Sequence, residues 1–445
     1  MSKIRFILSL IITFLVRFKV IILLGVVFGF LVFIAGRVIL PLLGGVETER
    51  IGLSGRYTSE KLPLFVLEKI SQGLTKINTK GELQEGLAKS WETPDGGKTW
   101  IFHLGEHFWQ DGKKVTSYSI NYTFEDVSIE KPDEETIIFK LNSQFAPFPF
   151  VVSKPVFRKG LLGTGEYKVT SVSLAGNYVE RIVMKNKANL KKVIKFYPNE
   201  ERAKLAFKLG QVDKLIDLTD PKPLASWKNV EVNSQVNKTR IVALFYNTMD
   251  EFLSEKLLRQ ALSYAIKKDE LTEEKEHFVR ALGPISSLSW YFNPQIKPYD
   301  FDPKRAEELL KEAEVKMGKK VEKLNLVSTP PLLEVAEKIK RYWEELGISI
   351  TVQVTSVMPS EYQAFLVMYD IPLDPDQYSI WHSQQHATNI SRYKDPRIDK
   401  LLEDGRQEVD PDKRKKIYLD FQRFLLEDAP ATFLFYPVSY TINRR

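Results

Sequence analysis

The feature that most constrains this chain is an apolar segment close to its N-terminus. Residues 20–36 read VIILLGVVFGFLVFIAG and contain no charged side chain. A helix needs about 20 apolar residues to cross a bilayer, and Arg37 can extend its side chain to the lipid headgroups. The apolar segment 6–16 is too short to span, so we interpret it as an interfacial helix or an extension of the anchor. The sequence therefore predicts one transmembrane helix.

Basic residues predict the orientation of this helix. Lys3, Arg5, Arg17 and Lys19 precede the main span, which places the N-terminus in the cytoplasm and the remaining chain in the periplasm or extracellular space. No small-residue cleavage site follows the apolar segment, so we expect it to be retained as an anchor. Residues 1–46 are thus interpreted as a cytoplasmic N-terminus and a single-pass membrane anchor.

The basic character of the chain comes largely from this anchor. The net charge is +7, but residues 1–46 carry five basic and no acidic residues, which leaves about +2 for the exterior part. The charge is therefore poor support for a nucleic acid partner. The chain has no cysteine, which excludes disulfides, thiolate metal sites, a thiol nucleophile and a lipid anchor attached to cysteine.

The exterior part predicts an α/β fold. β-Forming residues dominate 99–104 and 135–141, next to the turn sequences PDGG and QDGKK, so the first third should be rich in strands. Two later regions each predict a strand, a helix and a parallel strand with a right-handed crossover. They are 193–197, 200–209 and 214–218, and then 324–328, 331–346 and 348–354. Two such regions favour two α/β lobes.

Helix starts are marked by capping residues. Asn199 precedes one predicted helix, and Asp-Pro pairs begin three others at Asp302, Asp395 and Asp410. Apolar residues at helical spacing indicate a further helix over 254–266. Among the tryptophans, we expect Trp91, Trp100 and Trp343 to pack in a core.

The order of several motifs resembles family 5 of the extracellular solute-binding proteins, the oligopeptide, dipeptide and nickel binders of ABC importers. The first motifs are LAKSWETPDGGKTWIFHLGEHFWQDGKKVTSYSINYTFE (87–125), GTGEY (163–167) and LAFKLGQVDKLIDL (205–218). LFYNT (244–248) and LLRQALSYAIKKDEL (257–271) follow. DPDQY (374–378), RYKDPRIDKLLEDGR (392–406) and LEDAPATFLFYP (426–437) complete the pattern. Each motif is weakly specific, and the resemblance depends on their order over residues 73–443.

The resemblance implies a two-lobed, periplasmic-binding-protein-like (type II) fold with a hinge that closes over a ligand. Lobe I is expected over 47–238, lobe II over 239–430, and a C-terminal return to lobe I over 431–445. Lobe I should carry a reduced β-rich subdomain, because YTFEDV runs into DEETIIFKL without the family's helical insert. The end of the sequence at Arg445 leads us to expect a short or missing C-terminal extension.

The segment MYDIPLDPDQYSIWHS (368–383) concentrates acids among aromatic residues. AFLVMYD reads as a strand that ends at Asp370, and ligands in open α/β sheets bind beyond the C-terminal ends of strands. In the peptide-binding relatives an aspartate near this position binds the ligand's α-ammonium, although the spacing here is offset by one residue. We therefore expect Asp370 to be partly buried in apolar surroundings. Asp374 and Asp376 either join it or only shape a turn.

Other candidate ligand contacts lie in or near this segment and in a second aromatic stretch. They are Tyr378, Trp381 and Asn389, with Trp290 and Tyr291 of SLSWYFNP. Aromatic rings in a cleft can form walls for peptide side chains or stack on sugars. For Trp290 and Trp381 packing in a core is an equally open alternative.

Metal and enzyme functions find little support. The pairs His103/His107 and His382/His386 are spaced four residues apart, but neither carries the Glu of an HExxH zinc motif. We expect no cofactor, with nickel or heme uptake as minor alternatives. GxSxG, P-loop and dinucleotide-binding motifs are missing from the sequence. A carboxylate pair for glycoside hydrolysis depends on spatial separation, which sequence leaves open.

These observations favour a membrane-anchored solute-binding protein, not an enzyme, that delivers an oligopeptide to the permease subunits of an ABC transporter. The competing interpretations are a ligand-sensing or scaffold ectodomain without a permease, a binder of nickel, heme or sugar, and a carbohydrate-active enzyme.

Overall fold

The computed structural model describes residues 16–21, 24–25, 27–29, 32–33, 47–78, 81–271 and 279–445. Much of the apolar segment 20–36 and all of 1–15 lie outside the described residues, so the membrane anchor stays a prediction. Among the residues that are described, no helix is both long and apolar enough to cross a membrane.

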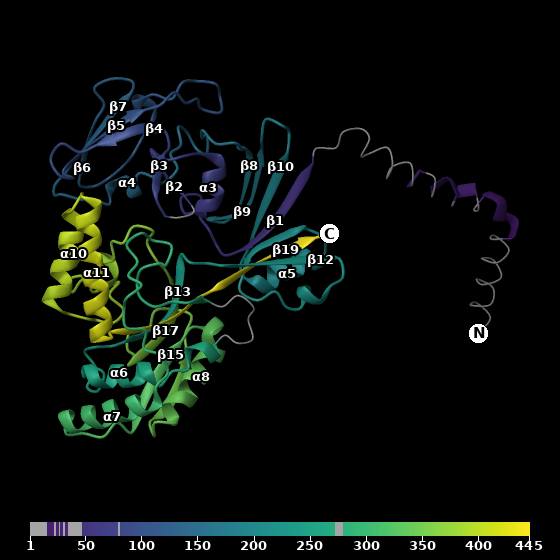
Figure 1. Ribbon diagram of the computed structural model, residues 1–445. Helices are drawn as coiled ribbons and strands as arrows, with labels where there is room; N and C mark the ends of the chain where they lie inside the picture. Colours follow the sequence, from purple (N-terminus) through teal and green to yellow (C-terminus); the bar gives the residue numbers. More distant parts are fainter. Residues whose placement is uncertain are drawn as a thin grey trace.

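Two large sheets organise the chain into two lobes (Figure 1). The first lobe is built on a seven-stranded sheet in the order β12-β19-β11-β1-β10-β9-β8. Its strands are β1 (Thr48–Ser54), β8 (Lys168–Ala175), β9 (Tyr178–Lys185), β10 (Lys191–Tyr197), β11 (Lys214–Leu218), β12 (Val230–Val236) and β19 (Val438–Arg444). Helices α3 (Leu64–Ile70) and α5 (Glu200–Lys208) and the turn η2 (Leu224–Ser226) complete this sheet's layer.

A small β-rich subdomain extends from the first lobe. It contains the two-stranded sheet β2-β3 and the four-stranded sheet β4-β5-β7-β6, at the upper left of Figure 1. Its elements are β2 (Thr75–Ile77), β3 (Leu83–Glu85), β4 (Ala88–Glu92), β5 (Thr99–Leu104), η1 (Ser117–Ser119), β6 (Val127–Glu130), β7 (Thr136–Leu141) and α4 (Phe148–Val151). β6 pairs directly with β7, with no helix between them. That this subdomain is smaller than in related proteins stays a prediction.

The second lobe is built on a six-stranded sheet in the order β14-β18-β13-β17-β15-β16. Its strands are β13 (Arg240–Tyr246), β14 (Val279–Arg280), β15 (Lys323–Ser328), β16 (Ser349–Val354), β17 (Ala364–Asp370) and β18 (Ala431–Tyr436). Its helices and turns are α6 (Lys256–Tyr264), η3 (Lys268–Leu271), α7 (Pro303–Met317), η4 (Pro330–Leu332), α8 (Leu333–Glu344), α9 (Tyr378–Trp381), α10 (Pro396–Gln407) and α11 (Pro411–Asp428).

Both predicted strand–helix–strand units are present. β15 and β16 pair in parallel across α8. β10 and β11 are also parallel, but β1 lies between them and pairs with both. β1, which comes early in the chain, is thus inserted between the two strands of a later strand–helix–strand unit. Local sequence patterns do not predict such an insertion.

The predicted helix starts are confirmed by side-chain caps. Asn199 accepts a hydrogen bond from the Arg202 amide, and Asp302 accepts one from the Arg305 amide. Asp395 and Asp410 cap α10 and α11 in the same way. These bonds satisfy backbone donors that a helix cannot pair internally.

The C-terminal return to the first lobe differs from the expected boundary. We expected it to begin at residue 431, but β18 pairs with β13 and β14 in the second sheet. The chain re-enters the first sheet only with β19, after Pro437. All six residues of β18, ATFLFY, are buried, which suits a strand in the interior of the second lobe's sheet.

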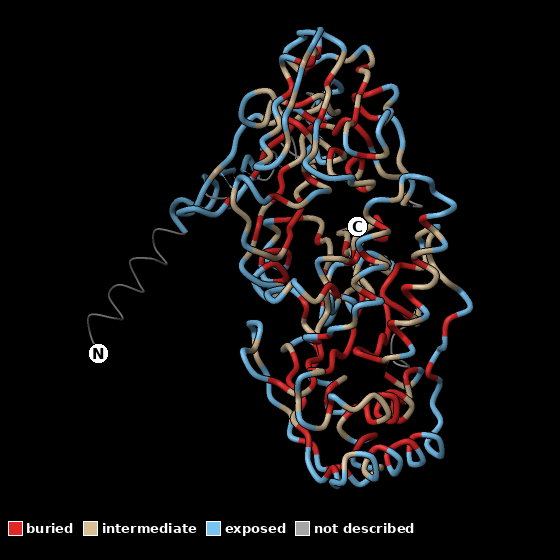
Figure 2. The backbone as a smooth tube through the Cα atoms, turned by 90° about the vertical axis from the view of Figure 1, so that its left-hand side faces the viewer, coloured by how far each residue is buried: buried red, intermediate tan, exposed pale blue. Residues whose placement is uncertain are grey.

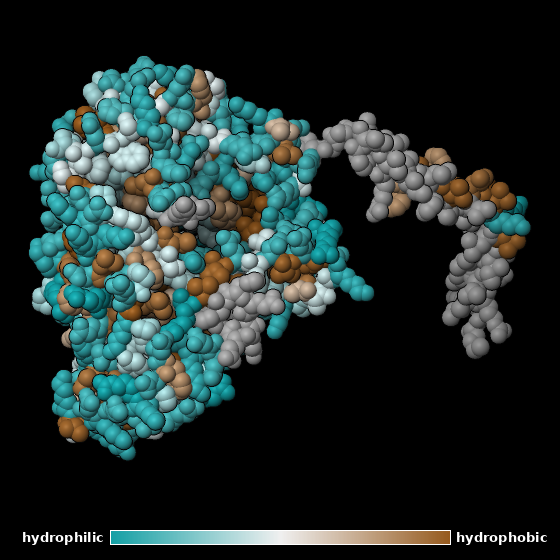
Figure 3. Space-filling model, viewed as in Figure 1, coloured by the Kyte–Doolittle hydropathy of each residue, from teal (hydrophilic) through white to brown (hydrophobic). Residues whose placement is uncertain are grey.

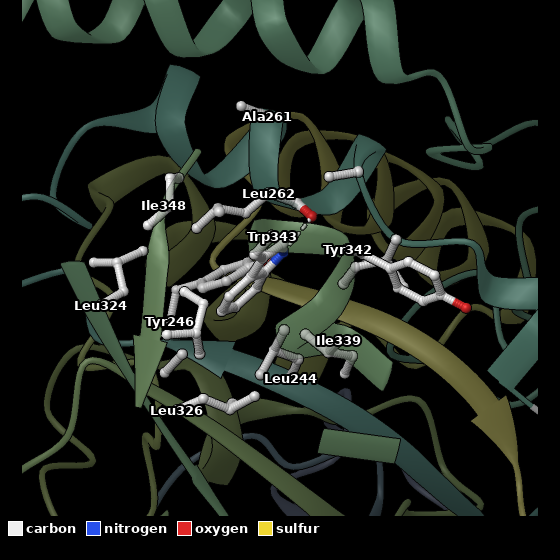
Figure 4. Packing of buried hydrophobic residues seen from close by; sticks show 14 of the residues in the cluster. Leu244, Tyr246, Ala261, Leu262, Leu324, Leu326, Ile339, Tyr342, Trp343 and Ile348 are labelled. Carbon is white, nitrogen blue, oxygen red and sulfur yellow. Dashed lines mark hydrogen bonds between the residues drawn. The ribbon is translucent and has the colours of Figure 1, made fainter. Parts of the chain in front are cut away.

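Each lobe has its own apolar interior, and buried residues gather inside both (Figure 2). In the second lobe Trp343 of α8 is fully buried against Leu244 and Tyr246 of β13 (Figure 4). Its indole Nε1 donates to the Leu262 carbonyl oxygen at 3.0 Å. The core positions expected for Trp343 and Trp100 are confirmed, and Trp91 packs at the edge of the subdomain's core.

Candidate functional site

The two lobes are joined by two chain crossings that lie side by side. Residues 237–239 lead from β12 into β13, and Pro437 leads from β18 into β19. The Asn237 amide donates to the Pro437 carbonyl oxygen at 2.8 Å, which ties the crossings together. A pair of short, adjacent crossings is the arrangement that a hinge requires.

An ion cluster lies beside these crossings and joins the lobes; we call Asp217, Arg240 and Asp370 the hinge cluster. Arg240 opens β13 and stands directly opposite Asp370, the last residue of β17. Its Nε donates to Asp370 Oδ1 at 2.8 Å, and its Nη1 lies 3.2 Å from Asp217 Oδ2. Asp217 belongs to β11 of the first lobe. One guanidinium is thus shared by carboxylates from both lobes.

Local backbone geometry aims Asp217 at the second lobe. The β11–β19 pairing shifts register between Leu215 and Leu218, and Asp217 has φ +56°. A bulge bends its strand and re-aims a side chain. Aspartate tolerates the left-handed region better than most residues. Ser439 holds the carboxylate by donating its hydroxyl to Oδ1 at 3.0 Å.

The hinge cluster is half-open to solvent. Burial lowers the pKa of the Arg240 guanidinium, but its bonds to Asp370 and Asp217 outweigh this effect and raise it overall. The Tyr57 phenol of the first lobe faces the same cluster. Burial and then the Asp217 carboxylate raise the pKa of Tyr57 above its ordinary value. Because the pKa of Arg240 is raised, its guanidinium keeps its charge at any physiological pH.

The surroundings of Asp370 differ from the prediction. AFLVMYD does form a strand that ends at Asp370, as expected. However, we expected a partly apolar environment, and the Asp370 side chain is 81% exposed and paired with Arg240. The reason is its place at the last position of β17, opposite an arginine rather than an apolar residue. No described residue donates a hydrogen bond to its Oδ2.

The lobes touch again at the opposite end of the interface, where Arg406 of α10 meets the β-rich subdomain. The Ala146 amide donates to the Arg406 carbonyl oxygen at 2.6 Å. The guanidinium lies 3.9 Å from the Tyr378 ring centroid and 5.3 Å from that of Phe145. Its Nε donates to Asp376 at 2.9 Å. The segment 370–378 therefore connects two places where the lobes meet.

Asp374 is a buried structural residue. Arg414 of α11 binds it with two hydrogen bonds of 2.6 Å, and both side chains are less than a tenth exposed. Burial alone would lower the pKa of the Arg414 guanidinium, but Asp374 raises it overall. Asp374 Oδ1 also accepts the Asp376 amide. The turn interpretation is therefore the one that this geometry favours for Asp374.

The aromatic candidates divide into buried and exposed residues. Trp381 is fully buried, donates to Gln377 Oε1 and packs on Phe245. Tyr378 stacks on His382 with ring centroids 4.0 Å apart. Trp290 is instead 47% exposed, with Lys415 Nζ 4.2 Å from its ring centroid. Of the two tryptophans predicted as ligand contacts, Trp381 is therefore a core residue and Trp290 is the one exposed to solvent.

Two further candidates support loops. Asn389 is buried and donates its Nδ2 to the Tyr393 carbonyl oxygen at 2.8 Å. Tyr291 packs edge-on against Tyr418 and below Arg414. Asn389 thus fixes the loop before α10, and Tyr291 packs beside the arginine that binds Asp374.

The histidine pairs do not form helical metal sites. α9 ends at Trp381, so His382 and His386 do not share a helix face. His382 is buried and lies 3.2 Å from Glu403. Within the described ranges, His, Asp and Glu side chains form no group of three or more that could hold a metal ion.

Sequence patterns missed three arginines and one aspartate of the interface. Asp217 lies within the motif LAFKLGQVDKLIDL (205–218), but the sequence does not show the bulge in β11 that turns the Asp217 side chain toward the second lobe. Arg240 could have been found as the residue that meets Asp370 once β13 and β17 were paired. Arg406 and Arg414 come from the helices that follow the acidic segment, with no local signal of their contacts.

Comparison with known proteins places this geometry in a family. A model of bacterial extracellular solute-binding proteins, family 5 (middle region), matches residues 82–389. The oligopeptide-binding protein AppA of Bacillus subtilis is 23% identical, with 86% of this chain and 83% of that protein covered. The di/tripeptide-binding protein 1 of Pseudomonas aeruginosa is also 23% identical, with 85% of each chain covered.

Solved structures show the same fold. NikZ from Campylobacter jejuni in complex with Ni(L-His) has a TM-score of 0.74 at 23% identity, over 90% of this chain and 94% of that chain. AppA from Bacillus subtilis in complex with a nonapeptide has a TM-score of 0.69 at 19% identity, over 90% and 95%. The chain belongs to family 5 of the bacterial extracellular solute-binding proteins, the solute-binding proteins of ABC importers.

Proposed function

We propose that this protein binds an oligopeptide between its two lobes and presents it to an ABC permease when the lobes close. The observation that carries the proposal is the Asp370 carboxylate, which ends β17 at the hinge and has one oxygen engaged by Arg240. The peptide-binding relatives support the ligand class. Figure 3 shows the surface hollowed between the lobes, with hydrophobic residues at the rim.

The α-ammonium of a peptide is the group that this carboxylate fits. A carboxylate and an ammonium form a charge-assisted hydrogen bond, which is stronger than a neutral one. Asp370 Oδ2, to which no described residue donates a hydrogen bond, supplies the acceptor, while Oδ1 accepts from Arg240 in this structure. Trp290 is the exposed aromatic candidate for a peptide side chain. The protein itself hydrolyses nothing in this proposal.

The experiment is a calorimetric titration of the full chain with a mixture of random tripeptides and with the same mixture after N-acetylation. We expect heat of binding with the free amines and about tenfold weaker binding after acetylation, since a hydrogen bond to a charged group contributes about 1.5–3 kcal/mol. Asp370→Asn should lose a similar factor for the free peptides and nothing for the acetylated ones.

The matched control is Asp300→Asn. Asp300 is an exposed aspartate that pairs with Arg280 at 2.6 Å within the second lobe. It should leave both titrations unchanged. Equal affinity of Asp370→Asn and the parent for the free peptides would contradict the assigned role. If heat of binding is observed only with a nickel–histidine complex, the peptide assignment is wrong and the ligand is of the class bound in the NikZ structure.

The apolar N-terminal segment is proposed as the membrane anchor of this exterior protein. Its support is the run of uncharged residues 20–36 and the preceding basic residues. Labelling the N-terminus of membrane-bound protein should identify Met1 or Ser2. A mature start near Glu47 would contradict the anchor.

A further inference from the structure

We propose that Arg240 is an interlobe latch that couples the binding of a cation at Asp370 to closure of the lobes. The inference rests on the proposed function where it takes this cation to be the ammonium of a bound peptide. It goes further by assigning roles to Arg240 and to Asp217, which do not have to touch the ligand.

The geometry makes Arg240 a shared group. It is the first residue of β13, a central strand of the second lobe, and it pairs with Asp370 on the same lobe and with Asp217 on the other. The contact with Asp370 is short, 2.8 Å, whereas the nearest contact with Asp217 is 3.2 Å. The guanidinium therefore sits closer to its own lobe, with the interlobe contact the looser of the two.

A cation at Asp370 changes this balance. It neutralises part of the carboxylate charge that holds Arg240 and also repels the guanidinium, so the pull of Asp217 becomes the larger one. The strengthened contact joins β11 to β13 directly beside both chain crossings. Binding at Asp370 thereby lowers the free energy of the closed form relative to the open form, as a ligand must to shift such an equilibrium.

The fixed parts of the cluster support a movable arginine. The Asp217 carboxylate is held by Ser439 and by the bulge in β11, and the backbone of Asp370 is held in β17. Arg240 is about one-third exposed and has a long side chain, so it is the member that can shift.

The chain supplies a matched control pair. Arg50 and Asp213 form two hydrogen bonds of 2.7 and 2.6 Å within the first lobe, with side chains 43% and 32% exposed. Asp213 directly precedes β11, and Asp217 lies within it. Asp217→Asn removes the interlobe charge pair, whereas Asp213→Asn removes a pair of similar exposure inside one lobe. Asparagine also tolerates the left-handed backbone of residue 217.

The test uses the full chain, whose lack of cysteine allows specific labelling. Spin labels at Lys113→Cys in the β-rich subdomain and Glu307→Cys on α7, both exposed positions, report the distance between the lobes. The distances are measured without ligand and with the free and acetylated tripeptide mixtures. Binding is followed by calorimetry, and folding is checked by thermal unfolding.

We expect the closed population of Asp217→Asn to fall about two- to fivefold relative to the open one, the range of an exposed ion pair. This fall should appear with and without peptide, while Asp213→Asn behaves as the parent. Arg240→Met should show the same fall, and the free peptides should close it no better than the acetylated ones. Identical distance distributions in Asp217→Asn and the parent would overturn the latch.

The two proposals fail in different ways. If no tripeptide binds the parent, the proposed peptide function fails, and the ligand-free distances still decide whether Asp217 and Arg240 hold the lobes together. If peptides bind and close the parent and Asp217→Asn equally, the binding proposal stands and the latch is wrong.

Discussion

Two acidic sites in this protein use the same chemistry in opposite settings. Asp374 and Arg414 form a bidentate pair that is almost fully buried inside the second lobe. In the hinge cluster, Arg240 is shared between Asp370, on its own lobe, and Asp217, on the other, and all three side chains are at least one-third exposed. Only three residues separate the buried Asp374 from the exposed Asp370 along the chain.

The contrast shows how burial divides structural from adjustable ion pairs. A buried charge that loses its partner is costly, so Asp374 and Arg414 stay together as long as the lobe is folded. An exposed pair is weak and can exchange its partners with a ligand or with solvent. The hinge cluster is therefore suited to a change of state, and the buried pair to holding the loop that carries it.

The largest effect is expected in the core beneath the acidic segment. Trp381→Ala should lower the free energy of unfolding by about 3–5 kcal/mol, because it leaves a large cavity against Phe245 and Phe433. Trp290→Ala, at an exposed position, should change it by less than about 0.5 kcal/mol. Urea unfolding of both variants measures this difference. Equal losses would mean that Trp290 is also a core residue.

The buried pair should come next. Asp374→Asn removes the charge that compensates Arg414 and should destabilise the protein by about 3 kcal/mol, the lower end for breaking a buried pair because the amide keeps some hydrogen bonds. Asp370→Asn should alter stability by less than about 0.5 kcal/mol. If the two variants unfold at the same urea concentration, the division between structural and adjustable acids is wrong.

The smallest effect concerns pH. Burial raises the pKa of the Asp376 carboxyl, although Arg406 and the Tyr378 amide oppose this. An acid with a raised pKa contributes stability below its ordinary pKa of about 4, and this contribution is lost as pH rises through the raised value. As pH rises from about 4 through the raised pKa, the free energy of unfolding of Asp376→Asn should therefore increase relative to that of the parent, by less than about 1 kcal/mol. A difference that is constant with pH would contradict the shift.

The sequence was informative wherever one segment decides a feature. Helix starts at Asp302, Asp395 and Asp410 depend on a cap and the turn that follows, and all three are confirmed. The strand that ends at Asp370 was equally local. The α/β lobes followed from two strand–helix–strand patterns.

Features that depend on pairing between distant segments were missed. The place of β18 in the second sheet is set by β13, almost two hundred residues earlier. The exposure of Asp370 and its pairing with Arg240 depend on the register of β13 with β17. The partner of Asp374 comes from a helix forty residues later. No pattern around these residues records such contacts.

The central claim is that a bound solute brings the lobes together, and one backbone amide reports this directly. The Ala146 amide donates across the interface to Arg406, while the neighbouring Phe145 amide donates to Gly97 within the first lobe. Hydrogen exchange of both amides can be followed by NMR with alanine and phenylalanine labelled, before and after saturation with free-amine tripeptides. We predict slower exchange at Ala146 and no change at Phe145. Unchanged exchange at Ala146 with binding confirmed by calorimetry would contradict the account.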